Sequence, residues 1–240
     1  MKHHFIDRYA ALQSPLHLLE ARSKILAFTA LIICVLSVPA GSGTLLLAEF
    51  FAAAILMGIS QVPLSYIMGR ILIILPFIVL ASLAVPWRDY QGLGILFARA
   101  ILCLILLILL TNTTRFVELL RGLRKLGCPR ILVVNLSFLY RYFFVLTEEA
   151  LRMKQARDCR RVGRAPLREE LKILSSMLGT LLIRSFERAE RMHSAMLSRG
   201  YSGEFPVAEA RPFTWRDLAF LSVVMLFVVL IFFLHNHPAA

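Results

Sequence analysis

The sequence predicts an all-α integral membrane protein with about five transmembrane helices and a cytoplasmic block of amphipathic helices inserted before the last span. Three observations support this prediction. Hydrophobic residues make up 58% of the chain, against about 45–50% in an ordinary globular domain. The mean hydropathy is +0.72, and long uncharged runs account for it. Most charged residues gather in one stretch between the fourth and fifth of these runs.

The net charge of +12 is concentrated in that stretch. Residues 112–217 hold 20 of the 27 Lys and Arg and 11 of the 15 Asp and Glu. The charge is therefore local, mixed in sign and flanked by apolar runs. A nucleic-acid-binding surface would combine basic residues with interleaved aromatic side chains, which the basic stripes lack. The distribution favours a cytoplasmic segment of a membrane protein, with the lipid bilayer and no nucleic acid among its partners.

Five apolar runs follow a polar leader of 24 residues, in which Ser14-Pro15 is a turn or helix-start signal. Each run is shorter than the roughly 20 residues that a spanning helix needs, so flanking residues must complete it. Pro39 to Gly43 closes the first run, and Pro76 should kink the third, which membrane helices tolerate. The predicted spans are residues 25–38, 45–59, 71–85, 95–110 and 218–234.

The basic residues also predict the orientation. The leader carries Lys2, Arg8, Arg22 and Lys24, whereas residues 39–44 and the tail after Leu234 carry no Lys or Arg. Basic segments stay on the cytoplasmic side of a membrane. Five spans with the N-terminus inside place each basic-rich segment in the cytoplasm and the C-terminus outside.

Three parts of the chain follow from this topology. Residues 1–110 form an N-terminal membrane domain of four spans, residues 111–217 a cytoplasmic coupling-helix domain, and residues 218–240 the final transmembrane helix and tail. Within the middle part, residues 131–147 and 171–183 are apolar enough to suggest further spans. Polar and charged residues interrupt or bound both segments, and a charge deep in a bilayer is costly. We interpret them as amphipathic helices at or under the membrane, with additional spans as the alternative.

No catalytic motif is evident. The chain contains no GxxxxGK[ST] phosphate loop, HExxH or GxSxG sequence, so we expect no enzymatic activity and no nucleotide hydrolysis by this chain. Glu148-Glu149 and the pair Glu187 and Glu190 could be acid–base groups. We interpret them instead as a charged helical stripe, in which residues four apart, such as Glu187 and Arg191, pair across a turn.

Cysteine and histidine side chains that could bind a metal are not grouped in the sequence. The cysteines Cys34, Cys103, Cys128 and Cys159 are far apart in the sequence and form no CxxC pair, which argues against a zinc site or a disulfide framework. The histidines cluster only as His3-His4 and as His235 with His237 near the termini. We therefore expect no metal and no cofactor on this chain.

Two arginines stand at predicted helix ends. Arg160 ends a charged run that begins at Glu148, and Arg199 ends a similar run directly before Gly200, a natural helix C-cap. An arginine in such a place can simply interact with the last carbonyl groups of its own helix. Two similar constructions in one cytoplasmic block favour a paired docking device, because the planar guanidinium directs several hydrogen bonds across an interface.

Four phrases of the sequence resemble the transmembrane (T) components of energy-coupling-factor transporters, and among them the CbiQ-type subunit of cobalt and nickel uptake systems. They follow the order of the family and cover nearly the whole chain. The phrases are SPLHLLEARSKIL from Ser14, TNTTRFVELLRGLRKLGCPRILV from Thr111, LYRYFFVLTEEALRMKQARDCRR from Leu139 and RSFERAERMHSAMLSRGYSG from Arg184.

The resemblance also implies site residues. The two Ala-Arg-Gly motifs of the family correspond to Cys159-Arg160-Arg161 and Ser198-Arg199-Gly200. Both central arginines are present. Arg161 replaces a glycine and cannot adopt a left-handed cap conformation easily, which affects the expected geometry of the first helix end.

The function implied by the resemblance is that of a scaffold in the bacterial inner membrane. The chain would join a CbiO-type ATPase dimer to a CbiM-type substrate-binding membrane subunit, with a CbiN-type small subunit as a further candidate partner. ATP and magnesium would bind the ATPases, and cobalt or nickel the substrate subunit. Two coupling helices would transmit the closing motion of the ATPases. The alternatives are a T component for vitamin uptake and, in another class, a membrane-bound enzyme.

Overall fold

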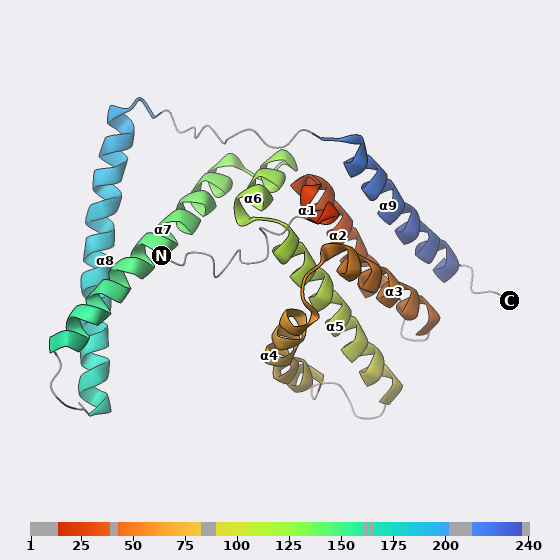
Figure 1. Ribbon diagram of the computed structural model, residues 1–240, viewed down its shortest axis with the longest axis horizontal. Coiled ribbons are helices and arrows are strands. Elements are labelled where there is room, and N and C mark those ends of the chain that lie inside the picture. Colours follow the sequence, from red (N-terminus) through yellow and green to blue (C-terminus); the bar gives the residue numbers. More distant parts are fainter. Residues whose placement is uncertain are drawn as a thin grey trace. The chain divides into compact units, whose positions relative to one another are not determined.

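The computed structural model describes residues 14–38, 43–82, 90–160, 163, 166–201 and 213–236, and the regular structure in these ranges is entirely helical (Figure 1). This confirms the predicted all-α fold. The chain divides into two compact units, one made of residues 1–128 and 209–240 and the other of residues 129–208.

The first unit is a helical bundle around α2. This central helix contacts α5, α6 and α9, while α5 also packs on α3 and α4. The bundle thus brings the C-terminal helix against a helix from the start of the chain. Its members are α1 (Pro15–Leu18), α2 (Ala21–Ser37), α3 (Gly43–Ser60), α4 (Leu64–Ser82), α5 (Tyr90–Thr113), α6 (Phe116–Lys125) and α9 (Trp215–Asn236).

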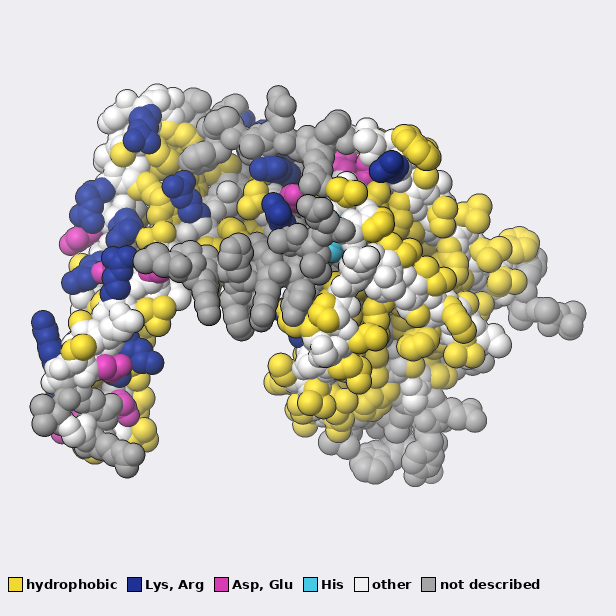
Figure 2. Space-filling view, viewed as in Figure 1, with side chains coloured by type: hydrophobic (Ala, Val, Ile, Leu, Met, Phe, Trp, Pro, Cys, Tyr) yellow, Lys and Arg dark blue, Asp and Glu magenta, His cyan; other side chains and the backbone are white. Residues whose placement is uncertain are grey.

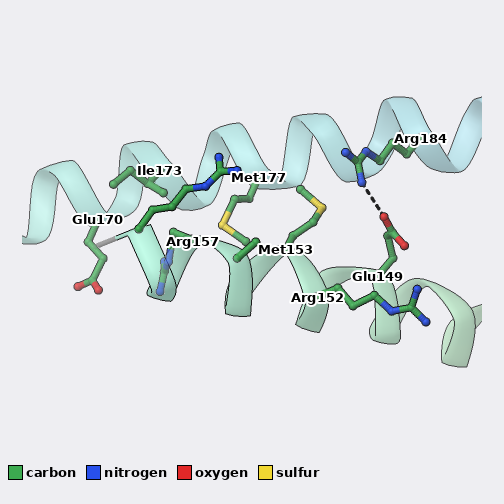
Figure 3. Close-up of a pocket in the computed structure, with 10 residues that line it drawn as sticks. Glu149, Arg152, Met153, Arg157, Glu170, Ile173, Met177 and Arg184 are labelled. Carbon is green, nitrogen blue, oxygen red and sulfur yellow. Dashed lines mark hydrogen bonds and ion pairs between the residues drawn. The ribbon is translucent and has the colours of Figure 1, made fainter. Parts of the chain in front are cut away.

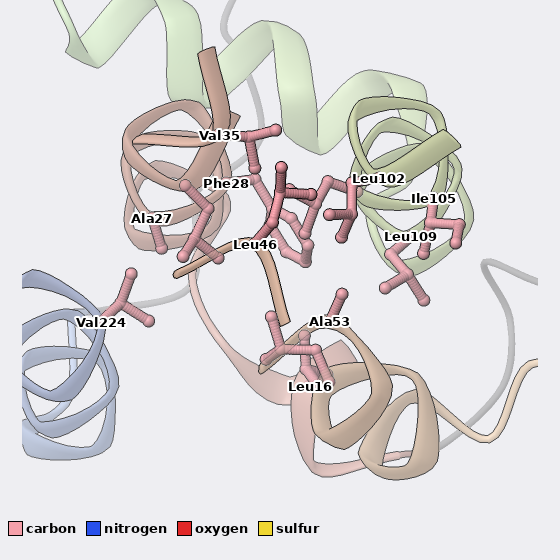
Figure 4. Close-up of a cluster of buried hydrophobic side chains, with 13 residues drawn as sticks. Leu16, Ala27, Phe28, Val35, Leu46, Ala53, Leu102, Ile105, Leu109 and Val224 are labelled. Carbon is pink, nitrogen blue, oxygen red and sulfur yellow. The ribbon is translucent and has the colours of Figure 1, made fainter. Parts of the chain in front are cut away.

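The core of this unit lies between α2, α3 and α5 (Figure 4). Phe28 and Val35 of α2 are almost fully buried, as are Leu102 and Leu109 of α5, and Val224 packs on this cluster from α9. Lipid tails are as apolar as these side chains, so close van der Waals packing rather than water exclusion holds such helices together.

Among the described residues, four helices are long and apolar enough to cross a membrane: Gly43–Ser60, Gly94–Thr113, Arg130–Arg160 and Trp215–Leu234. Three of them contain predicted spans, and Leu64–Leu80 is a shorter apolar helix. The third predicted span was too short at its N-terminal end, because α4 begins at Leu64, seven residues earlier than expected. Residues 83–85 of that prediction lie outside the described residues.

The first predicted span corresponds to α2, which begins at Ala21 rather than Ile25. Arg22 and Lys24, which the prediction places in the leader, therefore lie in the first turn of this helix. Ser14 and Pro15 do start a helix, the short α1, with Ser14 at its N-cap and Pro15 at its first position, where the missing N–H of proline costs nothing.

The second unit consists of two long helices, α7 (Arg130–Arg160) and α8 (Leu167–Ser198), which contact each other. The segments 131–147 and 171–183 lie wholly inside them. Glu169 and Glu170 stand in the first turn of α8, where negative charge interacts favourably with the helix dipole. Most apolar side chains of α8 are exposed, and none of its residues is buried. The unit therefore offers long surfaces rather than a core of its own.

Candidate coupling site on the second unit

The first predicted helix end is the C-terminus of α7. Cys159 and Arg160 are its last two residues, and both are exposed. Arg161 lies outside the described residues. Gly163 has a φ of 80°, a left-handed conformation that glycine adopts without strain. The left-handed glycine at this helix end therefore lies three residues after Arg160. At the second helix end, by contrast, Gly200 directly follows Arg199.

The second helix end is a glycine-capped C-terminus. Ser198 is the last residue of α8, Arg199 occupies the C-cap, and Gly200 has a φ of 75°. The Gly200 N–H donates to the Leu197 carbonyl and the Tyr201 N–H to the Met196 carbonyl, both at 3.0 Å. These bonds satisfy carbonyl groups that the helix itself leaves open. The cap predicted at Gly200 is confirmed, and the Arg199 side chain is exposed beside it.

The two helices run antiparallel. Tyr142 of α7 hydrogen-bonds Met192 of α8, and seven residues further along α7 Glu149 pairs with Arg184, eight residues earlier in α8. Arg160 therefore lies near the start of α8. Arg199 lies at its other end, which is roughly 40 Å away at 1.5 Å per residue. The predicted coupling arginines are not brought together, and each marks a different end of the helix pair.

A groove of about 620 Å³ lies between α7 and α8 (Figure 3). Its lining combines apolar side chains with an excess of arginine over glutamate. Arg184 closes one end by donating a 2.6 Å hydrogen bond to Glu149. The residues that line it include Glu149, Arg152, Met153, Arg157 and Arg160 from α7 and Glu170, Ile173, Met177 and Arg184 from α8.

This lining is suited to a protein partner that moves. Met153 and Met177 face each other across the groove, and the unbranched thioether side chain adapts to changing surfaces. Arg152 and Arg160 are exposed and can present a guanidinium fork to carboxylates. Figure 2 shows the same mixture on the visible face of α7 and α8, where Lys and Arg side chains lie among apolar ones.

The charged stripe behaves partly as predicted. Arg191 lies 3.7 Å from Glu187, and Arg152 lies 3.8 Å from Glu148, both as pairs four residues apart. Such exposed pairs contribute little stability. Arg184, on the same helix as Glu187 and Arg191, instead bridges to Glu149 of α7. The helical spacing could not reveal this contact, because it depends on how α7 and α8 are aligned.

Sequence reasoning missed a buried polar cluster in the first unit. The Lys24 side chain is completely buried, and its ammonium group donates to the Thr113 carbonyl at the end of α5, at 3.0 Å, and to the His17 carbonyl at 3.4 Å. Asn112 supplies a further carbonyl, 3.3 Å from the His17 ring. A positive charge at the last carbonyl groups of a helix complements its dipole. Lys24 thus joins the start of α2 to the end of α5.

Asp217 forms the second part of this cluster. One carboxylate oxygen accepts hydrogen bonds from the backbone N–H of Glu20 at 2.6 Å and from the Ser23 hydroxyl at 3.2 Å, while the other accepts from Thr214. The Glu20 carboxylate in turn pairs with Lys125 at 2.9 Å. These contacts tie α9 and α6 to the start of α2. The sequence signal that could have indicated this cluster is a charged residue directly before an apolar run. Lys24 precedes the first run and Asp217 precedes the last.

Among the residues that the structure describes, no group of three or more His, Cys, Asp and Glu could hold a metal ion. His3, His4 and His237 lie outside these residues, and the side chain of His235 is likewise not described. The four cysteines are all free.

Together, these features define an all-α membrane protein that carries a separate, basic and antiparallel helix pair with an exposed arginine at each end. The family model CbiQ, described as cobalt transport protein, matches residues 13–208. The chain belongs to this family, the CbiQ-type transmembrane components of energy-coupling-factor transporters, as its sequence phrases suggested. Its class is thus a membrane component of a transporter.

Individual relatives agree with this assignment. The cobalt transport protein CbiQ of Rhodobacter capsulatus is 35% identical over 103 residues, 43% of this chain and 42% of that protein. The nickel permease LarQ of Lactiplantibacillus plantarum is 31% identical over 124 residues, 51% of this chain and 45% of that protein. The energy-coupling factor transporter transmembrane protein EcfT of Bacillus subtilis is 27% identical over 259 aligned positions, 95% of this chain and 97% of that protein.

Proposed function

We propose that this chain is the coupling scaffold of a cobalt or nickel importer. It transmits the motion of cytoplasmic ATPases to a membrane-embedded substrate-binding subunit. The observation that carries the proposal is the antiparallel pair α7–α8, which is linked by the Tyr142–Met192 and Glu149–Arg184 contacts and has Arg160 at one end of α8 and Arg199 at the other. Each exposed arginine can dock on its own ATPase subunit.

The geometry suits the transmission of force. Helices of 31 and 32 residues are about 45 Å long and behave as levers. The Glu149–Arg184 hydrogen bond and the Tyr142–Met192 contact prevent α7 and α8 from sliding independently. When an ATP-bound dimer closes, it displaces the two arginine ends relative to each other. The helix pair then changes its crossing geometry and shifts whatever rests on its exposed apolar surface.

The proposed partners are those that the family resemblance implies. A CbiO-type ATPase dimer would bind the arginine ends and hold ATP with magnesium. A CbiM-type subunit, with a CbiN-type subunit as a further member, would bind the cobalt or nickel ion. This chain would need no cofactor of its own and would catalyse no reaction. Cys159, Arg161 and Ser198 would shape the two docking ends, and Gly200 would fix the direction in which the chain leaves α8.

The proposed orientation places the N-terminus, α7 and α8 in the cytoplasm of a bacterium, with the bundle in its inner membrane. The distribution of Lys and Arg supports this. By length and hydropathy α7 resembles a span. However, Arg141 lies within its apolar half and Glu148 and Glu149 follow, charges that are costly in a bilayer. We therefore propose that α7 lies at the membrane surface.

Vitamin import is the second candidate. The match to the Bacillus subtilis protein EcfT extends over 95% of this chain, whereas the matches to proteins named for cobalt and nickel are stronger locally but shorter. Metal import is favoured because the family model that matches carries the description cobalt transport protein.

The test is co-expression of the chain with the proposed ATPase and substrate-binding subunits. Arg160→Glu and Arg199→Glu together should abolish ATPase co-purification and uptake of radioactive cobalt or nickel, because they remove the guanidinium groups that are proposed to dock both ends and reverse their charge. Arg188→Glu, at an exposed position of α8 that does not line the α7–α8 groove, is the matched control and should retain both. Normal assembly and uptake in the double variant would overturn the proposal. Uptake of a vitamin instead of metal would favour the second candidate.

A further inference from the structure

A second groove, of about 690 Å³, lies in the first unit, beside Thr214, which hydrogen-bonds Asp217. It is formed by α1, the last turn of α3 and the first turns of α9. Its walls are mainly apolar: Leu16 is buried, while Leu18 and Ile59 are 56% and 42% exposed, and Phe220 of α9 completes the lining. An exposed apolar concavity of this size is typical of a binding site.

The position of the groove relative to the candidate spans identifies its level in the membrane. Ile59 lies in the last turn of the candidate span Gly43–Ser60, and Trp215 opens the candidate span Trp215–Leu234. Two spans thus reach the same membrane boundary at this groove. Trp215 is 78% exposed, and tryptophan prefers the headgroup level of a bilayer. The groove therefore opens where headgroups meet acyl chains.

The rim of the groove carries an uncompensated positive charge. Arg216 lines it, is exposed, and forms no hydrogen bond or ion pair with any residue that the structure describes. Its neighbour Asp217 cannot neutralise it, because that carboxylate is 1% exposed and accepts four hydrogen bonds from Glu20, Ser23 and Thr214. Charge complementarity at this rim favours an anionic ligand.

We propose that this groove binds one anionic phospholipid of the adjoining leaflet. The Arg216 guanidinium pairs with the lipid phosphate, for which its planar fork is well matched, and Trp215 lies beside the glycerol region. One acyl chain occupies the apolar channel along Leu18, Ile59 and Phe220. A free phosphate ion would leave this apolar lining unused, and a polar peptide would bury unpaired groups against it. The lipid would bridge α1, α3 and α9, whereas the Asp217 contacts tie α9 to α2.

The experiment uses the purified full chain in mixed micelles that contain palmitoyl-oleoyl phosphatidylglycerol or phosphatidylcholine, with retained lipid measured by native mass spectrometry. We expect one phosphatidylglycerol to be retained in preference to phosphatidylcholine. Arg216→Gln should reduce this retention about tenfold, the effect of losing one charge-assisted hydrogen bond of about 1.5 kcal/mol. Arg188→Gln removes the same charge from exposed α8 and should leave retention unchanged.

Ile59→Trp fills the apolar channel and should reduce retention of the lipid with Arg216 intact. Equal retention of the two lipids by the unmodified chain would overturn the proposal without any variant. Equal retention of phosphatidylglycerol by the Arg216→Gln and Arg188→Gln variants would also overturn the proposal, because it would indicate a diffuse electrostatic attraction. Displacement of the lipid by inorganic phosphate alone would show that a free anion, and not a phospholipid, is the ligand. None of these results depends on Arg160 or Arg199.

Discussion

Arg184 of α8 donates a 2.6 Å hydrogen bond to Glu149 of α7 and thereby fixes the alignment of two helices that otherwise share few contacts. The arginine is 55% exposed and the glutamate 20%, so solvent weakens their attraction. The pair closes one end of the α7–α8 groove (Figure 3). The pair therefore matters more for the alignment of α7 and α8 than for the stability of the fold.

Separating these two side chains should affect coupling more than stability. In a double-mutant cycle of Glu149→Gln and Arg184→Gln, we expect an interaction free energy of about 0.2–1 kcal/mol, the range for exposed ion pairs. Uptake relative to ATP hydrolysis in the assembled transporter should fall in each single variant, because α7 and α8 can slide. The Glu187→Gln variant removes an exposed intrahelical pair and serves as the control. Unchanged coupling in both single variants would contradict the lever mechanism.

Asp217 should be sensitive to an isosteric change. Asp217→Asn replaces one acceptor oxygen by an NH2 group, which would face the N–H and hydroxyl donors of Glu20, Ser23 or Thr214. Leaving buried donors unpaired costs about 1–3 kcal/mol. We expect a clear drop in the thermal unfolding midpoint in detergent, whereas Asp158→Asn, at a 48% exposed carboxylate, should change it little. An unaltered midpoint for Asp217→Asn would show that α9 is held by apolar packing alone.

The sequence predicted the helical class and the Gly200 cap, because each depends on local patterns of apolar residues or glycine. It could not reveal that Lys24 turns inward. A lysine at the edge of an apolar run usually faces water, but here α1 and the end of α5 offer it carbonyl partners. The same applies to Arg184, whose partner in α7 is 35 residues away. Contacts between distant segments depend on tertiary packing, which periodicity does not encode.

Lys24 itself gives a third prediction. Lys24→Met keeps much of the side-chain volume but removes the donor from the Thr113 and His17 carbonyl groups. At a fully buried position, this should lower stability by about 1–3 kcal/mol through the unpaired carbonyls. Thermal unfolding of the purified chain measures the effect. The matched Lys154→Met change, at an exposed position of α7, should be near neutral. Equal midpoints for the two variants would rule out a capping role for Lys24.

Gly122 and Gly179 give the fourth prediction, since the same substitution should have opposite effects at the two sites. At Gly122 of α6 an added Cβ would lie 2.8 Å from Ile25 Cδ1 and 3.2 Å from Ala21 Cβ, so α6 packs on α2 only because the side chain is absent. Gly122→Ala should destabilise the first unit by about 1–3 kcal/mol through overpacking. At Gly179 of α8 a Cβ meets nothing within 4 Å.

Gly179→Ala should therefore stabilise α8 by about 0.5–1 kcal/mol, the difference in helix propensity between the two residues. Circular dichroism of the full chain during thermal unfolding distinguishes the two effects. Adding Ile25→Val to Gly122→Ala removes the closest clashing atom and should restore part of the lost stability, although Ala21 still crowds the new methyl group. Equal stability of Gly122→Ala and Gly179→Ala would contradict the close packing of α6 on α2. It would also contradict the link between these helices to which the Glu20–Lys125 ion pair contributes.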